Sequence, residues 1–353
     1  MTNPDYASAP LASVIAPPRT AMRRKLQISD LPPYGFINAD WMKDARGVPP
    51  PDARPGGPNA SVEDYPTWFA SLVDDLSDRL WPRYDRSTGT WEGKARDTAM
   101  DLTLLDMQLM RRLRDQLDTP INRKVGTIES GPTHRHFFEE EDLDLIDRVA
   151  KPADFLRPGA SFREYDTNLS VNGAQAIYLD FAHEGWSATG DVDLQLKFEL
   201  QRPRAWQVAF MAGLPDIQYQ FAHTAVTPSM VSGHALQSTI AACHTYLDKM
   251  QGGPADLIDA WAQFAVDVGD RRVFAGVHYP SDNLASWITA LRLAPLAFGT
   301  ERALRACDFL CHAIREKSQV YAAIAAAAGP KDSPYHLPLE WLHEEMLSAS
   351  PRT

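Results

Sequence analysis

The sequence predicts an all-α protein with a helical bundle core and a proline-rich N-terminal arm. Hydrophobic residues make up 44% of the 353 residues, which is enough to form a buried core. From residue 61 onward apolar residues recur at helical spacing, and no alternating strand pattern persists beyond a few residues. Residues 1–60 hold 11 of the 27 prolines, which excludes long helices there. We therefore predict an extended arm over 1–60 and a single helical catalytic domain over 61–353.

The arm and the helices are defined by local signals. Proline fixes φ and removes hydrogen-bond donors, so the arm should be extended, either draped over the body or partly disordered. Its aromatic residues favour packing against the body. Ser61 and Asp64 can cap a first helix, in which Pro66 suits the first turn. Pro203 should end a later helix at Gln201 or Arg202. Further helices are expected near 97–117, 173–181, 192–201, 234–250, 255–268, 283–296 and 301–328.

Charge and cysteine content narrow the functional class. The formal charge of −11 argues against binding to nucleic acid or to an anionic membrane surface. The three cysteines, Cys243, Cys307 and Cys311, have no disulfide-framework spacing, so we expect a reducing compartment and buried thiols. No apolar run reaches the ~20 residues that span a bilayer, and no signal-peptide core follows Met1. We expect a cytoplasmic protein without a membrane span, and homo-oligomerisation stays open.

Two segments offer groups that bind anions. Lys197 and Arg204 are seven residues apart, so two helical turns would place them on one face, where an anion between them would offset their repulsion. Ser232, Gly233 and His234 stand just before a strong helical run. Glycine lets the backbone approach a ligand closely, and free amides at a helix N-terminus attract anions. The hydroxyl of Ser232 adds a donor, and His234 can reach a leaving group.

A third segment adds a cation and a second histidine. Arg272 and His278 are six residues apart across a glycine, and Asp282 follows four residues after His278. If a helix begins at Pro280, the carboxylate of Asp282 reaches the second ring nitrogen of His278. Such a contact fixes the imidazole tautomer and raises its basicity.

Together these groups have the chemistry for in-line attack on a phosphoryl group. Cations can stabilise the equatorial oxygens while one imidazole attacks and the other protonates the leaving oxygen. Charge-assisted hydrogen bonds contribute about 1.5–3 kcal/mol each, so several can hold an oxyanion without a metal. We therefore predict a site with no metal, acting on a small phosphorylated substrate.

The three segments resemble the signature of the type 2 phosphatidic acid phosphatase and vanadium haloperoxidase superfamily. That signature is Lys-x6-Arg-Pro, then Pro-Ser-Gly-His, then Ser-Arg-x5-His. The order and spacing match at 197–204, 232–234 and 272–278. The chain departs from the signature at Ala205, Val231 and Arg271, which replace its proline, proline and serine.

The resemblance implies a fold and a role for each residue. It implies a helical bundle with His278 as the phosphate nucleophile, or as the vanadate ligand of a haloperoxidase, and His234 as the acid/base. The oxyanion would be held by Lys197, Arg204, Arg272, Ser232 and the amide of Gly233. Because an Arg-Pro pair also occurs at Arg202-Pro203, Arg202 is the alternative to Arg204.

The leading prediction is a phosphoric monoester hydrolase that forms a phosphohistidine and needs no cofactor. The alternative is a haloperoxidase with vanadate as cofactor, and a catalytically altered binding relative is the second alternative. Haloperoxidases resemble one another in having an aromatic or basic residue five positions before the motif serine, where this chain has Thr227. Chloride-oxidising members also have a tryptophan three positions before the motif lysine, where this chain has Leu194. Both differences favour the hydrolase, whereas Phe198 and the chain length favour the haloperoxidase.

Other histidines are interpreted without a catalytic role. His134 and His136 precede a run of glutamates, but without a clear third ligand we interpret this stretch as a solvated loop. His223 and His244 lie near the motif segments, and we interpret them as packed or surface histidines.

Overall fold

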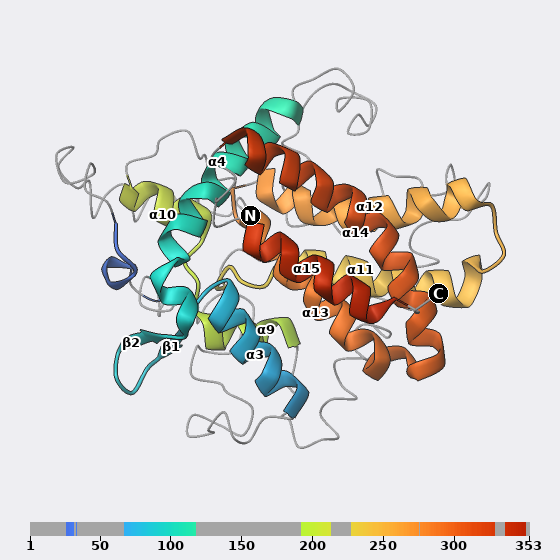
Figure 1. Ribbon diagram of the computed structural model, residues 1–353, viewed down its shortest axis with the longest axis horizontal. Helices are drawn as coiled ribbons and strands as arrows, with labels where there is room; N and C mark the ends of the chain where they lie inside the picture. The colour runs from blue at the N-terminus through green and yellow to red at the C-terminus, as the bar shows by residue number, and fades with distance from the viewer. Residues whose placement is uncertain are drawn as a thin grey trace, which may run out of the picture.

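The computed structural model describes residues 26–31, 33, 67–117, 192–212, 227–274, 276–328 and 336–350. These residues are predominantly helical, which confirms the α class (Figure 1). Most of the predicted arm, the predicted helix at 173–181, His134, His136 and His223 lie outside the described residues. The α-helices are α3 (Thr67–Arg79), α4 (Ala99–Leu117), α9 (Val192–Leu200), α10 (Ala205–Ala212), α11 (Gly233–Thr245), α12 (Ala255–Phe274), α13 (Pro280–Phe298), α14 (Thr300–Ala328) and α15 (His336–Ala349).

Shorter elements complete the described parts of the chain. The 3₁₀ helices are η2 (Ile28–Asp30) and η5 (Lys94–Asp97), and a π-helix over Tyr246–Met250 continues α11. The strands β1 (Arg83–Asp85) and β2 (Thr90–Glu92) form an antiparallel hairpin with Tyr84 opposite Trp91. The hairpin was not predicted, because three-residue strands are too short to show an alternating pattern.

Most predicted helices are confirmed, with shifts at their ends. The helix predicted over 255–268 continues to Phe274, and the one predicted from 283 begins at Pro280. Helices α10 and α15 were not predicted. All three cysteines are buried and free, as expected for thiols that act as small apolar side chains.

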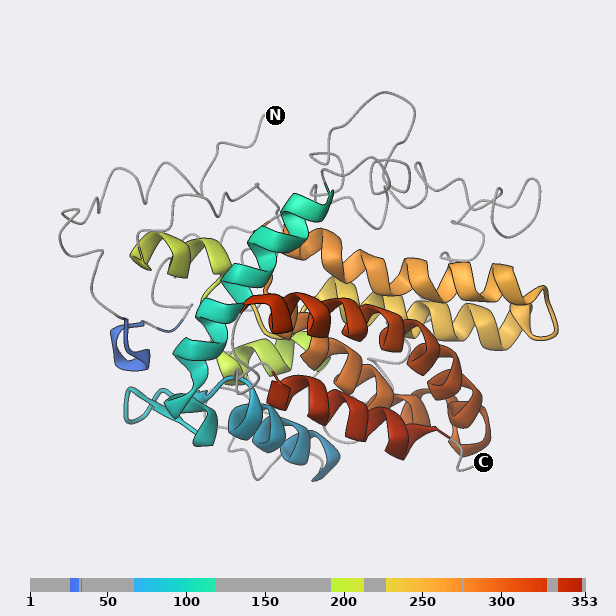
Figure 2. The same cartoon turned by 45° about the horizontal axis from the view of Figure 1, so that its top comes forward.

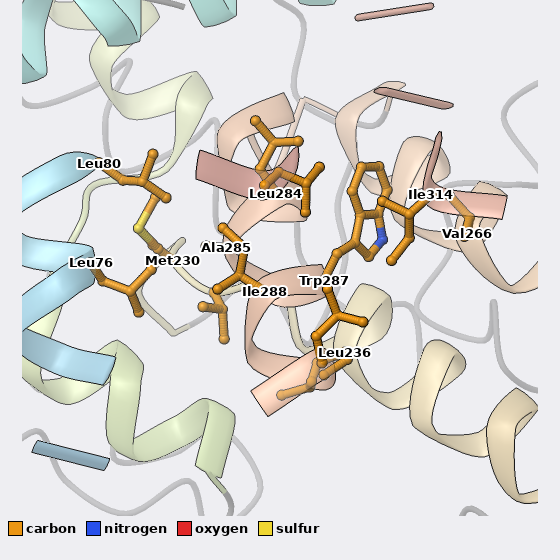
Figure 3. Packing of buried hydrophobic residues seen from close by; sticks show 14 of the residues in the cluster. Leu76, Leu80, Met230, Leu236, Val266, Leu284, Ala285, Trp287, Ile288 and Ile314 are labelled. Atoms are coloured by element: carbon orange, nitrogen blue, oxygen red, sulfur yellow. The ribbon is translucent and has the colours of Figure 1, made fainter. Parts of the chain in front are cut away.

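Helix α13 is the central element of the packing. It is buried along almost its whole length and contacts α11, α14, α15 and α4. In Figures 1 and 2, α11 and α12 run side by side, α15 lies alongside α13 and α14, and α4 crosses near one end of the group. Figure 3 shows the α13 side chains Leu284, Ala285, Trp287 and Ile288 between Leu76, Leu80 and Met230 on one side and Val266 and Ile314 on the other. The start of α13, where Asp282 lies, is therefore held in a dense core.

Within the described ranges, none of the helices has the length and apolar character needed to cross a membrane.

Gly269 lies where α12 packs closely against α13 and α11. A Cβ atom there would lie 2.9 Å from the side-chain Cγ of Asn283 on α13 and 3.0 Å from the Cβ of Ala235 on α11. We expect Gly269→Ala to lower the free energy of unfolding by about 1 kcal/mol. Overpacking costs ~1–3 kcal/mol, against a gain of ~1 kcal/mol in helix propensity. Urea unfolding measures this, with exposed Gln319→Ala on α14 as control. A Gly269→Ala protein as stable as the control would contradict the tight packing.

Candidate active site

The first motif is divided between two helices. Helix α9 ends at Leu200 because Gln201 takes a positive φ of 48° and Pro203 follows. Lys197 lies in the last turn of α9, whereas Arg204 directly precedes α10. The prediction that two helical turns place them on one face is therefore wrong, because the chain leaves the helix between them. The ammonium group of Lys197 donates to the carbonyl of Val231, just before α11.

The guanidinium of Arg204 is fixed by two loops and faces His278. Its Nε donates to the carbonyl of Thr227 at 2.7 Å, and one terminal nitrogen donates to the Thr227 hydroxyl at 3.2 Å. The other terminal nitrogen donates to the carbonyl of Val277 at 2.9 Å and lies 2.8 Å from Nε2 of His278. Arg204 is 1% exposed, so its charge is directed at the histidine with little screening by water.

Arg202, the alternative to Arg204, has a different environment. Its terminal nitrogens lie 2.7 Å from Oδ1 of Asp282 and 2.9 Å from Oδ2 of Asp106. The guanidinium also lies over the ring of Tyr279, with its central carbon 3.9 Å from the ring centroid. Arg202 is thus paired with two carboxylates, and Arg204 is the arginine of this segment that contacts His278.

The second motif forms the start of α11. Ser232 is the N-cap, and its hydroxyl oxygen accepts from the amide of Ala235 at 3.4 Å. Its carbonyl accepts from the hydroxyl of Ser286 at 2.9 Å, which ties this N-terminus to α13. Gly233 and His234 occupy the first turn, where amides without intrahelical partners and the helix dipole favour an anion. The N-terminal position predicted for Ser232, Gly233 and His234 is confirmed.

The third motif forms a turn between α12 and α13. Gly276 takes a φ of 75°, and the amide of His278 donates back to the carbonyl of Arg272 at 3.3 Å. The turn places His278 just before Pro280, the first residue of α13. Nδ1 of His278 lies 3.1 Å from Oδ2 of Asp282, which confirms the predicted contact.

Asp282 is held by several donors at once. Its Oδ2 also accepts from the amide of Tyr279 at 3.0 Å and from the hydroxyl of Ser229, while Oδ1 accepts from Arg202. Burial alone would raise the pKa of Asp282, but the charge of Arg202 and the hydrogen bond with His278 hold that pKa below its usual value. An ionised Asp282 can only accept, so Nδ1 of His278 carries the proton and its Nε2 lone pair is directed toward Arg204.

Burial and the neighbouring positive charges both lower the pKa values of the two histidines. Burial, followed by the charge of Arg204, lowers the pKa of His278 well below its usual value. Burial, followed by the charges of Arg272 and His278, lowers the pKa of His234 in the same way. Burial and the neighbouring Arg204 lower the pKa of Lys197 to about 7. The charges of Lys197, Arg204 and Arg272 thus all act on His234, and those of Lys197 and Arg204 also act on His278.

Three contributors to the site were not predicted as such. Thr227 holds Arg204, Ser229 donates to Asp282, and Asp106 on α4 binds Arg202. The Arg202-Pro203 pair drew attention to Arg202, but no local pattern distinguishes Asp106 from other acidic residues of its helix. His244, at the far end of α11, pairs with Asp248 at 3.3 Å, as expected for a histidine outside the site.

In the parts of the chain that the structure describes, no group of three or more histidine, cysteine, aspartate or glutamate side chains is arranged to hold a metal ion. Comparison with protein-family models, with curated proteins and with solved structures gives no match for the chain.

Anion binding at this site should depend on pH. Sulfate keeps both negative charges through the neutral pH range, so a change of its affinity with pH reports the titration of groups on the protein. Lys197 has a pKa of about 7, so we expect sulfate affinity to fall by up to about tenfold per pH unit as the pH rises above 7. Isothermal titration calorimetry measures both the affinity and the protons taken up.

The matched control is Lys197→Arg, because a guanidinium keeps its charge in this range. We expect this variant to show a weaker pH dependence above neutrality. Equal sulfate affinity of the original protein from about pH 6 to pH 8 would contradict the assigned role of Lys197, since one titrating cation predicts a slope there.

Proposed function

We propose that the chain is a phosphoric monoester hydrolase of the type 2 phosphatidic acid phosphatase and haloperoxidase superfamily. In this proposal the helices around α13 are the bundle core of that superfamily. The observation that carries the proposal is the pair of contacts on the ring of His278. Nδ1 bonds to Asp282, and Nε2 lies 2.8 Å from the cationic Arg204. This is the arrangement of an oriented imidazole nucleophile beside a group that binds the oxyanion.

The first chemical step is transfer of the phosphoryl group to His278. Its neutral Nε2 attacks phosphorus as the bond to the leaving oxygen breaks, and Arg204 exchanges its contact with Nε2 for one with a phosphoryl oxygen. The Nδ1 proton stays on His278, where Asp282 stabilises the positive charge that develops on the ring. His234 gives its proton to the leaving oxygen, so an alcohol departs.

The second step regenerates the enzyme. His234, now neutral, accepts a proton from water as the water attacks the phosphohistidine, which releases phosphate and restores both histidines. Lys197, Arg204 and Arg272 stabilise the equatorial oxygens in both steps, with the hydroxyl of Ser232 and the amide of Gly233 as further donors. A phosphate dianion opposes the positive field around His234, so substrate binding raises the pKa of that histidine and supplies the acid.

The haloperoxidase alternative uses the same residues. Nε2 of His278 would be the ligand of vanadate, and the surrounding cations fit its oxygens as they fit those of phosphate. Bound vanadate would supply the activation of hydrogen peroxide toward halide. The contacts of Thr227 favour the hydrolase. Haloperoxidases place an aromatic or basic residue at this position, whereas the hydroxyl of Thr227 accepts a hydrogen bond from Arg204.

Two assays on the full chain decide between these activities. Hydrolysis of p-nitrophenyl phosphate that vanadate inhibits supports the hydrolase. Halide-dependent turnover of peroxide after loading with vanadate, without phosphatase activity, would overturn it in favour of the alternative. Neither activity, with sulfate or vanadate still bound, would indicate a binding protein.

The two histidines should respond differently to the leaving group. We expect His278→Ala to abolish turnover of every phosphate ester, because no covalent intermediate can form. His234→Ala removes the proton donor, which contributes about 10²–10⁴-fold and contributes less for acidic leaving groups. Its loss should therefore be larger for an alkyl phosphate than for p-nitrophenyl phosphate. Steady-state rates of both variants on both substrates measure this.

Trapping of the intermediate gives a second readout of the roles. His234→Ala should accumulate phosphohistidine at residue 278, since the residue that activates the hydrolytic water is missing. Intact-protein mass spectrometry after rapid quenching detects it, with His244→Ala, outside the site, as control. Greater sensitivity to the leaving group in the His278→Ala protein would reverse the assignment.

A further inference from the structure

Asp106 is a fully buried carboxylate on α4, a helix that carries none of the three motifs. Its Oδ1 accepts from the backbone amide of Ser281 at 3.1 Å, and its Oδ2 accepts from the Ser281 hydroxyl and from Arg202 at 2.9 Å. The amide of Ser281 belongs to the first turn of α13 and therefore has no acceptor within that helix. Asp106 thus caps α13 from outside, one residue before Asp282.

Arg202 connects this carboxylate to the catalytic histidine. It lies between Asp106 and Asp282, with both side chains 0% exposed in each ion pair. The rings of Tyr279 and Trp81 lie 3.9 Å and 5.0 Å from its central carbon. Asp282 in turn bonds to Nδ1 of His278. A chain of charged contacts therefore runs from Asp106 through Arg202 and Asp282 to the imidazole.

The charges along this chain explain why a second carboxylate is needed. With Asp282 alone, the whole charge of Arg202 would act on the carboxylate that must also accept from His278. A buried arginine paired with one carboxylate would pull that group toward itself and weaken its bond to the imidazole. Burial raises the pKa of Asp106 to about 6, although Arg202 and Ser281 limit the rise, so Asp106 is an anion at neutral pH. The negative charge of Asp106 also attracts Arg202, so Arg202 pulls less strongly on the carboxylate of Asp282.

We infer that Asp106 is a positioning residue for His278, acting through Arg202 and Ser281 to fix the carboxylate of Asp282 against the imidazole. The expected effect of Asp106 on turnover rests on the proposed function, whereas its expected effect on the imidazole of His278 does not. Asp106 lies on the far side of Arg202 from His278 and does not touch the reacting atoms.

Asp106→Asn tests the inference in the full-length protein. The amide keeps the shape but removes the charge, and it directs either a neutral oxygen or an N–H group at Arg202. We expect kcat for p-nitrophenyl phosphate to fall about 10–100-fold, as for partners that orient ligating histidines. KM and sulfate affinity should not change, because Lys197 and Arg204 are untouched. Asp101→Asn, at an exposed carboxylate of the same helix, is the matched control and should leave kcat, KM and sulfate affinity unchanged.

The direct readout is the Nδ1–H proton resonance of His278, assigned by its disappearance in His278→Ala. We expect this proton to resonate downfield in the original protein and in Asp101→Asn, and to move upfield or exchange rapidly in Asp106→Asn. If Asp106→Asn does not fold, Ser281→Ala is the second variant. It removes the hydroxyl that both Asp106 and Arg202 contact but keeps the charge of Asp106, and it should shift the same resonance by a smaller amount.

The outcomes separate this inference from the proposed function. An unchanged resonance together with an unchanged kcat in the folded Asp106→Asn protein, or in Ser281→Ala if that variant alone folds, overturns the role of Asp106 and leaves the hydrolase intact. A shifted resonance in a protein that hydrolyses no phosphate ester supports the role of Asp106 while the proposed function fails. Equal loss of sulfate affinity and of kcat would show general damage to the site and also overturn the inference.

Discussion

The buried pairing of Arg202 with Asp106 and Asp282 is the interaction on which the rest of the site depends. It joins α4, the segment between α9 and α10, and the start of α13, which are far apart in sequence. Burial of an unpaired charge is costly, so each of the three groups requires the other two. Once they are paired, Asp282 is fixed, and the ring of His278 follows because Nδ1 has one carboxylate partner. The orientation of His278, the proposed nucleophile, is thus a consequence of core electrostatics.

The same core also brings the other cations to this point. Helix α13 packs against α11, and Ser286 on α13 donates to the carbonyl of Ser232, so the N-terminus of α11 has a fixed position relative to His278. Lys197 reaches this N-terminus from α9 through the carbonyl of Val231. Arg204 is held by backbone carbonyls of two loops. Neutral carbonyl acceptors therefore help to orient the charged groups of Lys197 and Arg204.

Sequence reasoning succeeded where the physical cause was local. The contact between His278 and Asp282 follows from a helix that begins at Pro280, and the place of Ser232 just before α11 follows from the helical run after it. It failed where tertiary contacts decide. Placing Lys197 and Arg204 on one helical face was wrong because Gln201 and Pro203 redirect the chain, and only the packing of loops returns Arg204 to the site. Asp106 had no sequence signal, since its partners Arg202 and Ser281 are 96 and 175 residues away.

The protonation of the site links its chemistry to the presence of an anion. Burial and the charges of the neighbouring cations lower the pKa of both histidines. In the proposed mechanism this suits His278, because a nucleophile must be neutral. The proposed role of His234 requires the opposite, because an acid must hold a proton. A bound phosphate dianion would place negative charge beside His234 and raise its pKa. Under this proposal the acid forms only when the substrate that needs it has bound.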